Sequence, residues 1–85
     1  MFDLAELSGQ HVLEIGCGDG RLTRRYAGRT ARVTAVDPWA EGIARARKNL
    51  PGGLQTRVEF RPIAFLDFAA TEPSAFDVAI LAWSL

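Results

Sequence analysis

Three glycines alternate with other residues in the stretch GCGDG, which follows an apolar run and precedes a segment with helical spacing. Gly16, Gly18 and Gly20 can adopt positive φ, and they leave no Cβ between the backbone and a ligand. Backbone N–H groups at the start of a helix favour a negatively charged group. One acid, Glu14, precedes the stretch, and a second, Asp37, ends the next apolar run. The spacing therefore indicates a site that binds a ligand through the backbone.

Two nucleotide-binding motifs also contain a glycine turn, and the residues after Gly20 count against both of them. A phosphate-binding P-loop needs Lys and then Ser or Thr after its last glycine, whereas Arg21 and Leu22 stand here. This excludes the P-loop. The dinucleotide fingerprint GxGxxG would place its third glycine at position 21, so Arg21 counts against a nicotinamide cofactor, although Asp37 has the required spacing.

The glycine turn must be positioned by strands and helices, and the apolar pattern predicts them. Strands are expected in the apolar runs at 12–15, 33–36, 58–60 and 76–85. Helices are expected from the turn to about Gly28 and over 40–50, while residues 64–75 form a short helix or a loop. Because crossovers between parallel strands are right-handed, this alternation predicts an open α/β sheet with helices on its faces. A ligand would then lie at the carboxyl ends of the strands, beside the turn.

Composition limits the chain to one small domain, residues 1–85, with balanced charges and 48% hydrophobic residues. All ten Lys and Arg residues fall between Arg21 and Arg61, but acids are interleaved with them, which favours a solvated surface over a nucleic-acid interface. Cys17 is the only cysteine, so neither a disulfide nor a Cys/His metal site is predicted. The start of the chain does not resemble a secretion signal, and no apolar stretch approaches the ~20 residues of a membrane span. We therefore expect a cytoplasmic protein.

The combination of Glu14, the three alternating glycines and Asp37 after the next strand resembles the class I S-adenosylmethionine-dependent methyltransferases. The segment VLEIGCGDG is similar to the family's first motif, and VTAVDPW is similar to the segment after it. The resemblance implies a Rossmann-like sheet with its first four strands in the order 3-2-1-4. It also implies S-adenosyl-L-methionine as the cofactor and methyl transfer to an undetermined acceptor.

The resemblance assigns roles to the turn and to the end of the second strand. Glu14 would support the turn and the methionine amino group. The methionine part of the cofactor would lie along the turn residues, which are Gly16, Cys17, Gly18 and Gly20. Asp37 would accept hydrogen bonds from both ribose hydroxyls, a task suited to an ionised carboxylate, and Pro38 lies where family members pack an apolar side chain on the adenine.

The adenine side of the expected site departs from the family pattern. Family members often have an acid after the third strand, followed by a small or apolar residue that covers the ring, but Ile63 and Ala64 stand at these positions. Ala64 is the expected ring contact, and the acid is missing. Asp67 is either its replacement or a loop or helix-cap acid. Trp39 is either a second adenine contact or a helix-start residue lying on the sheet.

The resemblance covers residues from about Gln10 to Leu85, the first half of a fold that normally has seven strands. The fourth strand would then be an apolar edge, which invites pairing with another chain. We therefore expect either a fragment of a longer protein or a homodimer through this strand. No catalytic residue is assigned, and Cys17 is not expected to act as a nucleophile because no base lies near it in the sequence.

These observations lead to three hypotheses. The first is the cofactor-binding half of a methyltransferase that acts on an unknown acceptor. The alternative is a non-catalytic Rossmann-like binding module that dimerises through its fourth strand. A fragment of a nicotinamide-dependent oxidoreductase is the third. None of them requires a membrane, a metal or a nucleic-acid partner.

Overall fold

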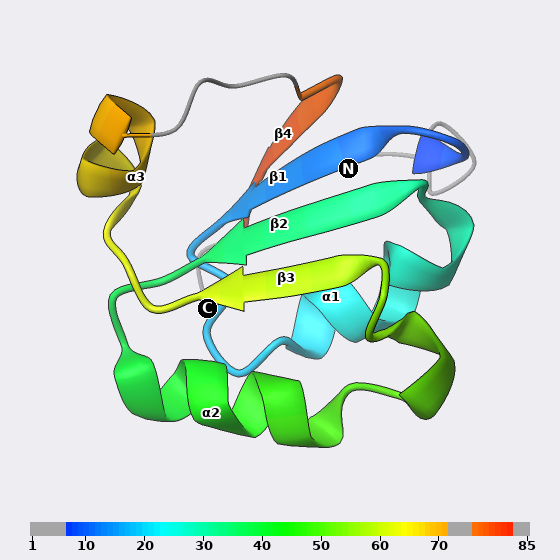
Figure 1. The fold of residues 1–85 in the computed structure, drawn as a ribbon, viewed down its shortest axis with the longest axis horizontal. Coiled ribbons are helices and arrows are strands. Elements are labelled where there is room, and N and C mark those ends of the chain that lie inside the picture. Colours follow the sequence, from blue (N-terminus) through cyan, green and yellow to red (C-terminus); the bar gives the residue numbers. More distant parts are fainter. Residues whose placement is uncertain (1–6, 72–75, 83–85) are drawn as a thin grey trace.

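The structure, a computed structural model, describes residues 7–71 and 76–82. Its elements in chain order are β1 (His11–Ile15), α1 (Arg21–Tyr26), the 3-10 helix η2 (Ala27–Arg29), β2 (Arg32–Val36), α2 (Ala40–Asn49), the 3-10 helix η3 (Gly52–Leu54), β3 (Val58–Arg61), α3 (Phe65–Thr71) and β4 (Val78–Leu81). The four strands form one parallel sheet in the order β3-β2-β1-β4. Figure 1 shows α1 and α2 on one side of this sheet and α3 on the other. The predicted Rossmann-like architecture is confirmed.

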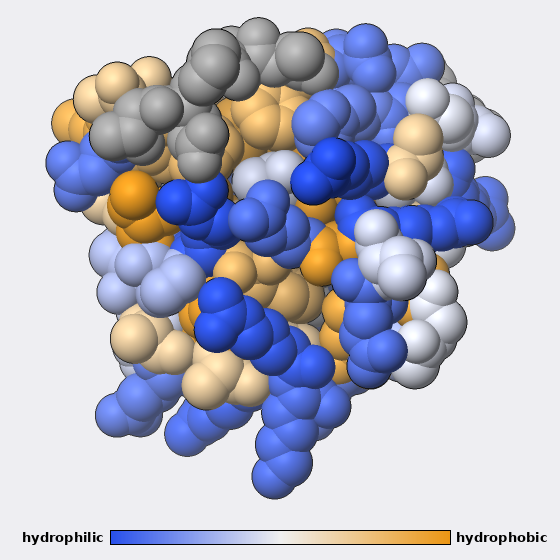
Figure 2. Space-filling view, in the orientation of Figure 1, coloured by the Kyte–Doolittle hydropathy of each residue, from blue (hydrophilic) through white to orange (hydrophobic). Residues whose placement is uncertain are grey.

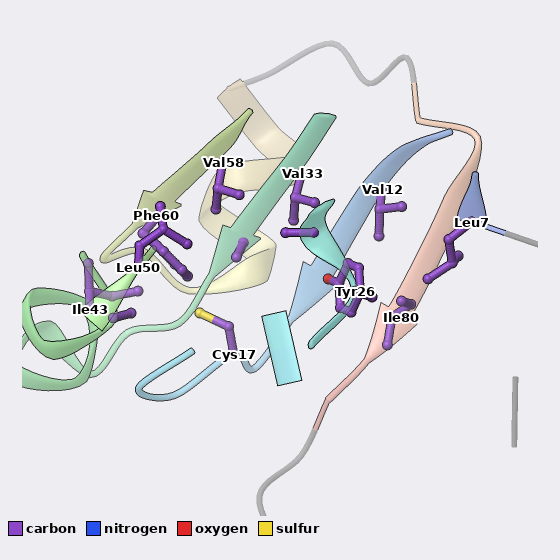
Figure 3. Packing of buried hydrophobic residues seen from close by; sticks show 13 residues of the cluster. Leu7, Val12, Cys17, Tyr26, Val33, Ile43, Leu50, Val58, Phe60 and Ile80 are labelled. Carbon is purple, nitrogen blue, oxygen red and sulfur yellow. The ribbon is translucent and has the colours of Figure 1, made fainter. Parts of the chain in front are cut away.

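Buried side chains lie on both faces of the sheet, because successive side chains of a strand point to opposite faces. Val12 of β1 belongs to the larger buried cluster, which also includes Tyr26 of α1 and Ile43 of α2 (Figure 3). The next residue, Leu13, belongs to a smaller cluster with Phe68 of α3. The nearly continuous apolar runs of the sequence therefore reflect strands that are buried on two sides.

Three element boundaries differ from the expected ones or settle an open alternative. The first helix ends at Tyr26, before the predicted Gly28, and the chain continues as η2. Residues 65–71, within the segment expected as a helix or a loop, form α3. The fourth strand is Val78–Leu81 rather than 76–85, because its register against β1 ends where Leu81 meets Ile15, the last residue of β1. Residues 83–85 of that expected strand lie outside the described residues.

Arginines bind backbone carbonyl groups around β3, which forms one edge of the described sheet. Arg47 Nη2 donates to the carbonyl of Phe60 at 2.8 Å. Arg57 Nη1 donates to the carbonyls of Gly28 and Thr30, at 2.9 and 3.2 Å. Hydrophilic side chains cover much of the face over β3 and α2 (Figure 2). Part of the basic middle of the sequence therefore stabilises the edge of the sheet.

The helices of the described ranges include none with the length and apolar character of a membrane span.

Candidate functional site

The glycine turn joins β1 to α1 and has the backbone conformation that its composition predicts. Gly16, Gly18 and Gly20 have φ values of +81°, +59° and +82°, a region that side-chain-bearing residues avoid. Gly20 also lies so close to α2 that a Cβ there would come within 2.9 Å of the Ala46 Cβ. A Cβ on Gly18, in contrast, would meet no atom within 4 Å. The turn is therefore packed against the protein at Gly20 and open at Gly18.

Asp37 holds the turn at the end of β2. Its Oδ2 accepts a hydrogen bond from the Gly18 N–H at 2.9 Å, and its Oδ1 accepts one from the Trp39 N–H at 2.8 Å. The carbonyl of Val36 accepts bonds from the Gly16 and Cys17 N–H groups, at 2.9 and 3.3 Å. Three consecutive amides and one carboxylate thus join the carboxyl ends of β1 and β2, where the fold predicts a ligand.

A cavity of about 780 Å³ opens at this end of the sheet. The predicted residues that line it are Glu14, Gly16, Cys17, Gly18 and Asp37. Its volume is within the usual range for small-molecule sites, roughly 300–1,000 Å³. The structure thus brings together five of the eight predicted site residues around one cavity. A sixth, Gly20, packs against α2 and does not line the cavity.

The remaining two predicted residues, Pro38 and Ala64, do not line this cavity. Pro38 is exposed, and Ala64 is half-buried before α3. Asp67 is exposed in the first turn of α3 and does not line the cavity either. The expected adenine contacts of Pro38 and Ala64 stay predictions, and the position of Asp67 favours its interpretation as a helix-start acid.

Trp39 forms one wall of the cavity through packing that the sequence did not reveal. Its side chain is 46% exposed and lies over the first turn of α2, where a Cβ on Gly42 would come within 2.2 Å of the ring. The Arg45 guanidinium lies 5.6 Å from the ring centroid, and Arg45 also lines the cavity. The absence of a side chain at Gly42 therefore allows the indole to fold onto the helix. The only signal in the sequence was an aromatic residue two positions after Asp37.

Besides Asp19, which is part of the turn, three further residues line the cavity and were not among the predicted ones. Arg21 and Leu22 begin α1 directly after the turn, and Ala82 follows β4. Arg21 Nε donates to Asp19 Oδ2 at 3.2 Å, an exposed ion pair. Their position next to the glycine motif was a local signal for the first two, whereas the pairing of β4 with β1 brings Ala82 to the site.

Glu14 is fully buried beneath the turn. Thr23 Oγ1 donates to its Oε1 at 2.7 Å, and the Tyr26 hydroxyl donates a short hydrogen bond to the same oxygen. Oε2 is buried and has no hydrogen-bond partner among the described residues. Burial raises the pKa of this carboxyl, while the hydrogen bonds from Tyr26 and Thr23 act in the opposite direction.

Cys17 is buried in the turn and is a neutral thiol at physiological pH. Burial is the main cause that raises its pKa to about 12, and the charges of Glu14 and Asp37 contribute. Because the thiolate is the reactive form, this environment disfavours nucleophilic catalysis. The expectation that Cys17 does not act as a nucleophile is therefore consistent with its surroundings.

His11 lies at the start of β1, away from the carboxyl ends of the strands. Its ring packs 4.5 Å from the ring of Phe76, measured between centroids, and its backbone N–H donates to Asp77 Oδ2 at 2.8 Å. These contacts hold His11 at the amino end of the sheet, outside the candidate site.

Comparison with known proteins identifies the class to which this arrangement belongs. Residues 12–85 match a family described as a methyltransferase domain. A ubiquinone biosynthesis O-methyltransferase from Leptothrix cholodnii is 37% identical over 75 residues, covering 88% of this chain and 32% of that protein. A crystal structure described as precorrin 8W decarboxylase from Methanobacterium thermoautotrophicum has a TM-score of 0.78 at 31% identity, over 92% of this chain and 42% of the other. A tRNA methyltransferase from Aquifex aeolicus has a TM-score of 0.78 at 29% identity, over 91% and 32% of the two chains.

The chain therefore belongs to the class I S-adenosylmethionine-dependent methyltransferases. The predicted first motif, Glu14 to Gly20, lies within the matched residues, as does Asp37. The chain spans about a third of the length of the curated relatives that it matches.

Proposed function

We propose that this chain binds S-adenosyl-L-methionine in the cavity at the glycine turn and forms the cofactor-binding part of a methyltransferase. The observation that carries the proposal is the link between the turn and the second strand, in which Asp37 accepts the Gly18 N–H beside a cavity of about 780 Å³. A carboxylate and an uncovered stretch of backbone thus lie beside a cavity large enough for a small-molecule ligand.

The residues present fit this cofactor. Gly18 leaves room at the turn, where a Cβ would meet nothing within 4 Å, and Glu14 offers a buried oxygen without a partner among the described residues. Among the described residues, each carboxylate oxygen of Asp37 accepts one hydrogen bond, and a carboxylate oxygen can accept a second. We assign the methionine part to the turn and Glu14, and the ribose hydroxyls to Asp37.

Bound S-adenosylmethionine would supply an electrophilic methyl group on a sulfonium sulfur. Attack on such a group requires alignment of the acceptor more than proton transfer, so the role of this part of the protein is to bind and orient. Trp39 and the turn would exclude water from one side of the cofactor. No residue of the chain is assigned as a catalytic acid or base.

The acceptor is not specified by this half of the fold. A tRNA methyltransferase and a relative named as a ubiquinone biosynthesis O-methyltransferase share it with this chain. The relatives at 36–43% identity that carry the latter name favour an oxygen acceptor over a nitrogen acceptor. Neither the non-catalytic module nor the nicotinamide alternative is favoured by these comparisons.

Substitution of Asp37 tests the proposal. Asp37→Ala removes the carboxylate that meets both the turn and the proposed ribose, so we expect the affinity for S-adenosylhomocysteine to fall at least about tenfold, as when a charged hydrogen-bonding group is removed. Isothermal titration measures this affinity. The matched control is Glu59→Ala, which removes an exposed acid outside the cavity and should leave the affinity within about twofold of wild type. Equal affinities for Asp37→Ala and wild type would contradict the assigned role.

NADH serves as the second ligand in the same titration. We expect binding of S-adenosylhomocysteine and none of NADH, because Arg21 stands where the dinucleotide fingerprint needs glycine. The opposite result would favour the oxidoreductase alternative.

We also propose that β4 mediates self-association of this chain. β4 is an edge of the described sheet, and its last residue, Leu81, has a side chain that is 61% exposed.

A further inference from the structure

The buried cluster around Glu14 contains two hydroxyl groups on one side of a carboxylate. Thr23 and Tyr26 lie three residues apart on α1, so their side chains share a face of the helix. Both are fully buried, and both hydroxyls donate to Oε1 of Glu14. Figure 3 shows Tyr26 within the buried cluster that also contains Val12 of β1. Two hydroxyl groups thus donate to the same carboxylate oxygen of Glu14.

The other oxygen of Glu14 is left without a partner among the described residues, although it is buried. A buried acceptor with no donor is costly, and a charged one more so. Glu14 nevertheless lines the cavity beside Gly16 and Gly18. The arrangement is therefore complementary to a ligand group that carries hydrogen-bond donors.

The charges around the turn indicate which kind of donor fits. Asp37 also lines the cavity and adds a negative charge, while Cys17 is a neutral thiol and adds none. Arg21, the cation nearest in sequence, already pairs with Asp19, and Arg45 lies over the Trp39 ring. A cationic group with several N–H donors, such as an ammonium, is the complementary ligand group.

We propose that Tyr26 and Thr23 are positioning residues that hold Glu14 by one oxygen, so that its other oxygen recognises the ammonium of the cofactor's methionine part. This inference rests on the proposed cofactor site and adds the residues that determine amine selectivity there. Neither hydroxyl contacts the ligand in this arrangement. They stabilise the ionised carboxylate against its burial and prevent it from rotating.

The test compares two ligands that differ only in the amine, S-adenosylhomocysteine and its desamino analogue, which keeps the carboxylate, thioether and nucleoside. Isothermal titration gives the ratio of their affinities. For the wild-type chain we expect a preference of at least about tenfold for the amine, as for a charge-assisted hydrogen bond in a desolvated site. For Tyr26→Phe and Thr23→Val we expect this ratio to fall several-fold, with the affinity for the desamino analogue nearly unchanged.

Two further variants separate positioning from a structural effect. Thr30→Val removes a buried hydroxyl that donates to the Ala27 carbonyl at 2.9 Å instead of to Glu14, so the ratio should stay at its wild-type value. Glu14→Gln keeps an acceptor for both hydroxyls but places an amide N–H₂ opposite the ammonium, so the ratio should fall even if Tyr26→Phe does not fold. Circular dichroism melting checks the fold of each variant.

Each outcome separates this inference from the function on which it rests. If the wild-type chain binds S-adenosylhomocysteine but Tyr26→Phe weakens both ligands equally, the hydroxyls only support the fold and the inference is overturned. The same conclusion holds if the wild-type chain does not distinguish the two ligands. If the wild-type chain binds neither ligand, the proposed cofactor site itself is wrong and the inference fails with it.

Discussion

Backbone conformation and close packing both disfavour a side chain at Gly20. Its φ is +82°, and a Cβ would lie 2.9 Å from the Ala46 Cβ and 3.2 Å from the Phe60 ring. We expect Gly20→Ala to lower the free energy of unfolding by about 2–4 kcal/mol, from left-handed strain together with overpacking. Urea unfolding followed by circular dichroism measures the change.

Gly18 provides the control for that substitution. It has φ of +59°, but a Cβ there would meet nothing within 4 Å. Gly18→Ala should therefore cost only the conformational part, about 1–2 kcal/mol. Equal losses of stability in the two variants would contradict the claim that the turn is packed tightly against α2 at Gly20.

The motif was most informative about the conformation of single residues. Positive φ at the three alternating glycines followed from their type, because it reflects a local steric property of glycine. The burial of Glu14 and its two hydroxyl donors did not follow from the motif, since Thr23 and Tyr26 reach it only when α1 packs on the sheet.

Among the elements, β3 is an edge whose outer side is covered by an arginine. Arg47 of α2 donates to the Phe60 carbonyl at 2.8 Å, and edge strands commonly carry positive residues that block pairing with other chains. We expect Arg47→Ala to lower the free energy of unfolding by about 1 kcal/mol through loss of this hydrogen bond. Urea titration measures the effect.

Lys48 is the matched control on the same helix. Lys48→Ala removes a neighbouring exposed positive charge and should change stability by no more than about 0.5 kcal/mol. If the two substitutions have the same effect, helix α2 responds to charge alone and the contact with β3 contributes nothing.

The elements were predicted best where the apolar period is clear. All four strands were placed, because the first, second and fourth are nearly continuously apolar and the third alternates Val58 and Phe60 with charged residues. The length of the fourth was wrong, because the end of β4 is decided by the length of β1 rather than by its own composition. The sequence left open whether residues 65–71 form a helix or a loop. The packing of Phe68 against Leu13 accounts for the helix.

At the scale of the whole molecule, the apolar surface near β4 predicts self-association. Leu81 at the end of β4 is 61% exposed. We expect the 85-residue chain to form dimers through the edge of β4, because an uncharged apolar edge offers unpaired backbone groups to another chain. Light scattering after size-exclusion chromatography measures the mass across a concentration series.

Leu81→Lys places a charge on this edge and should shift the chain to monomers. Glu59→Lys makes a charge change on the exposed side of β3 instead and should leave the dimer intact. A wild-type chain that is monomeric at every concentration would rule out association through β4.

The sequence by itself determined the class of the protein, the order of its elements and the location of the turn. These depend on local properties: glycine conformation, the apolar period of strands and helices, and an acid directly after a strand. Family comparison bears out the class and the cofactor that the motif indicated.

Only the tertiary structure decided how the site is built around that turn. It brought the Asp37 carboxylate to the Gly18 N–H and left one oxygen of Glu14 without a partner among the described residues. It also placed Pro38 and Ala64 outside the cavity lining. The physical reason is that these features arise from contacts between elements far apart in the chain, and such contacts depend on how helices and strands pack rather than on any local pattern of residues.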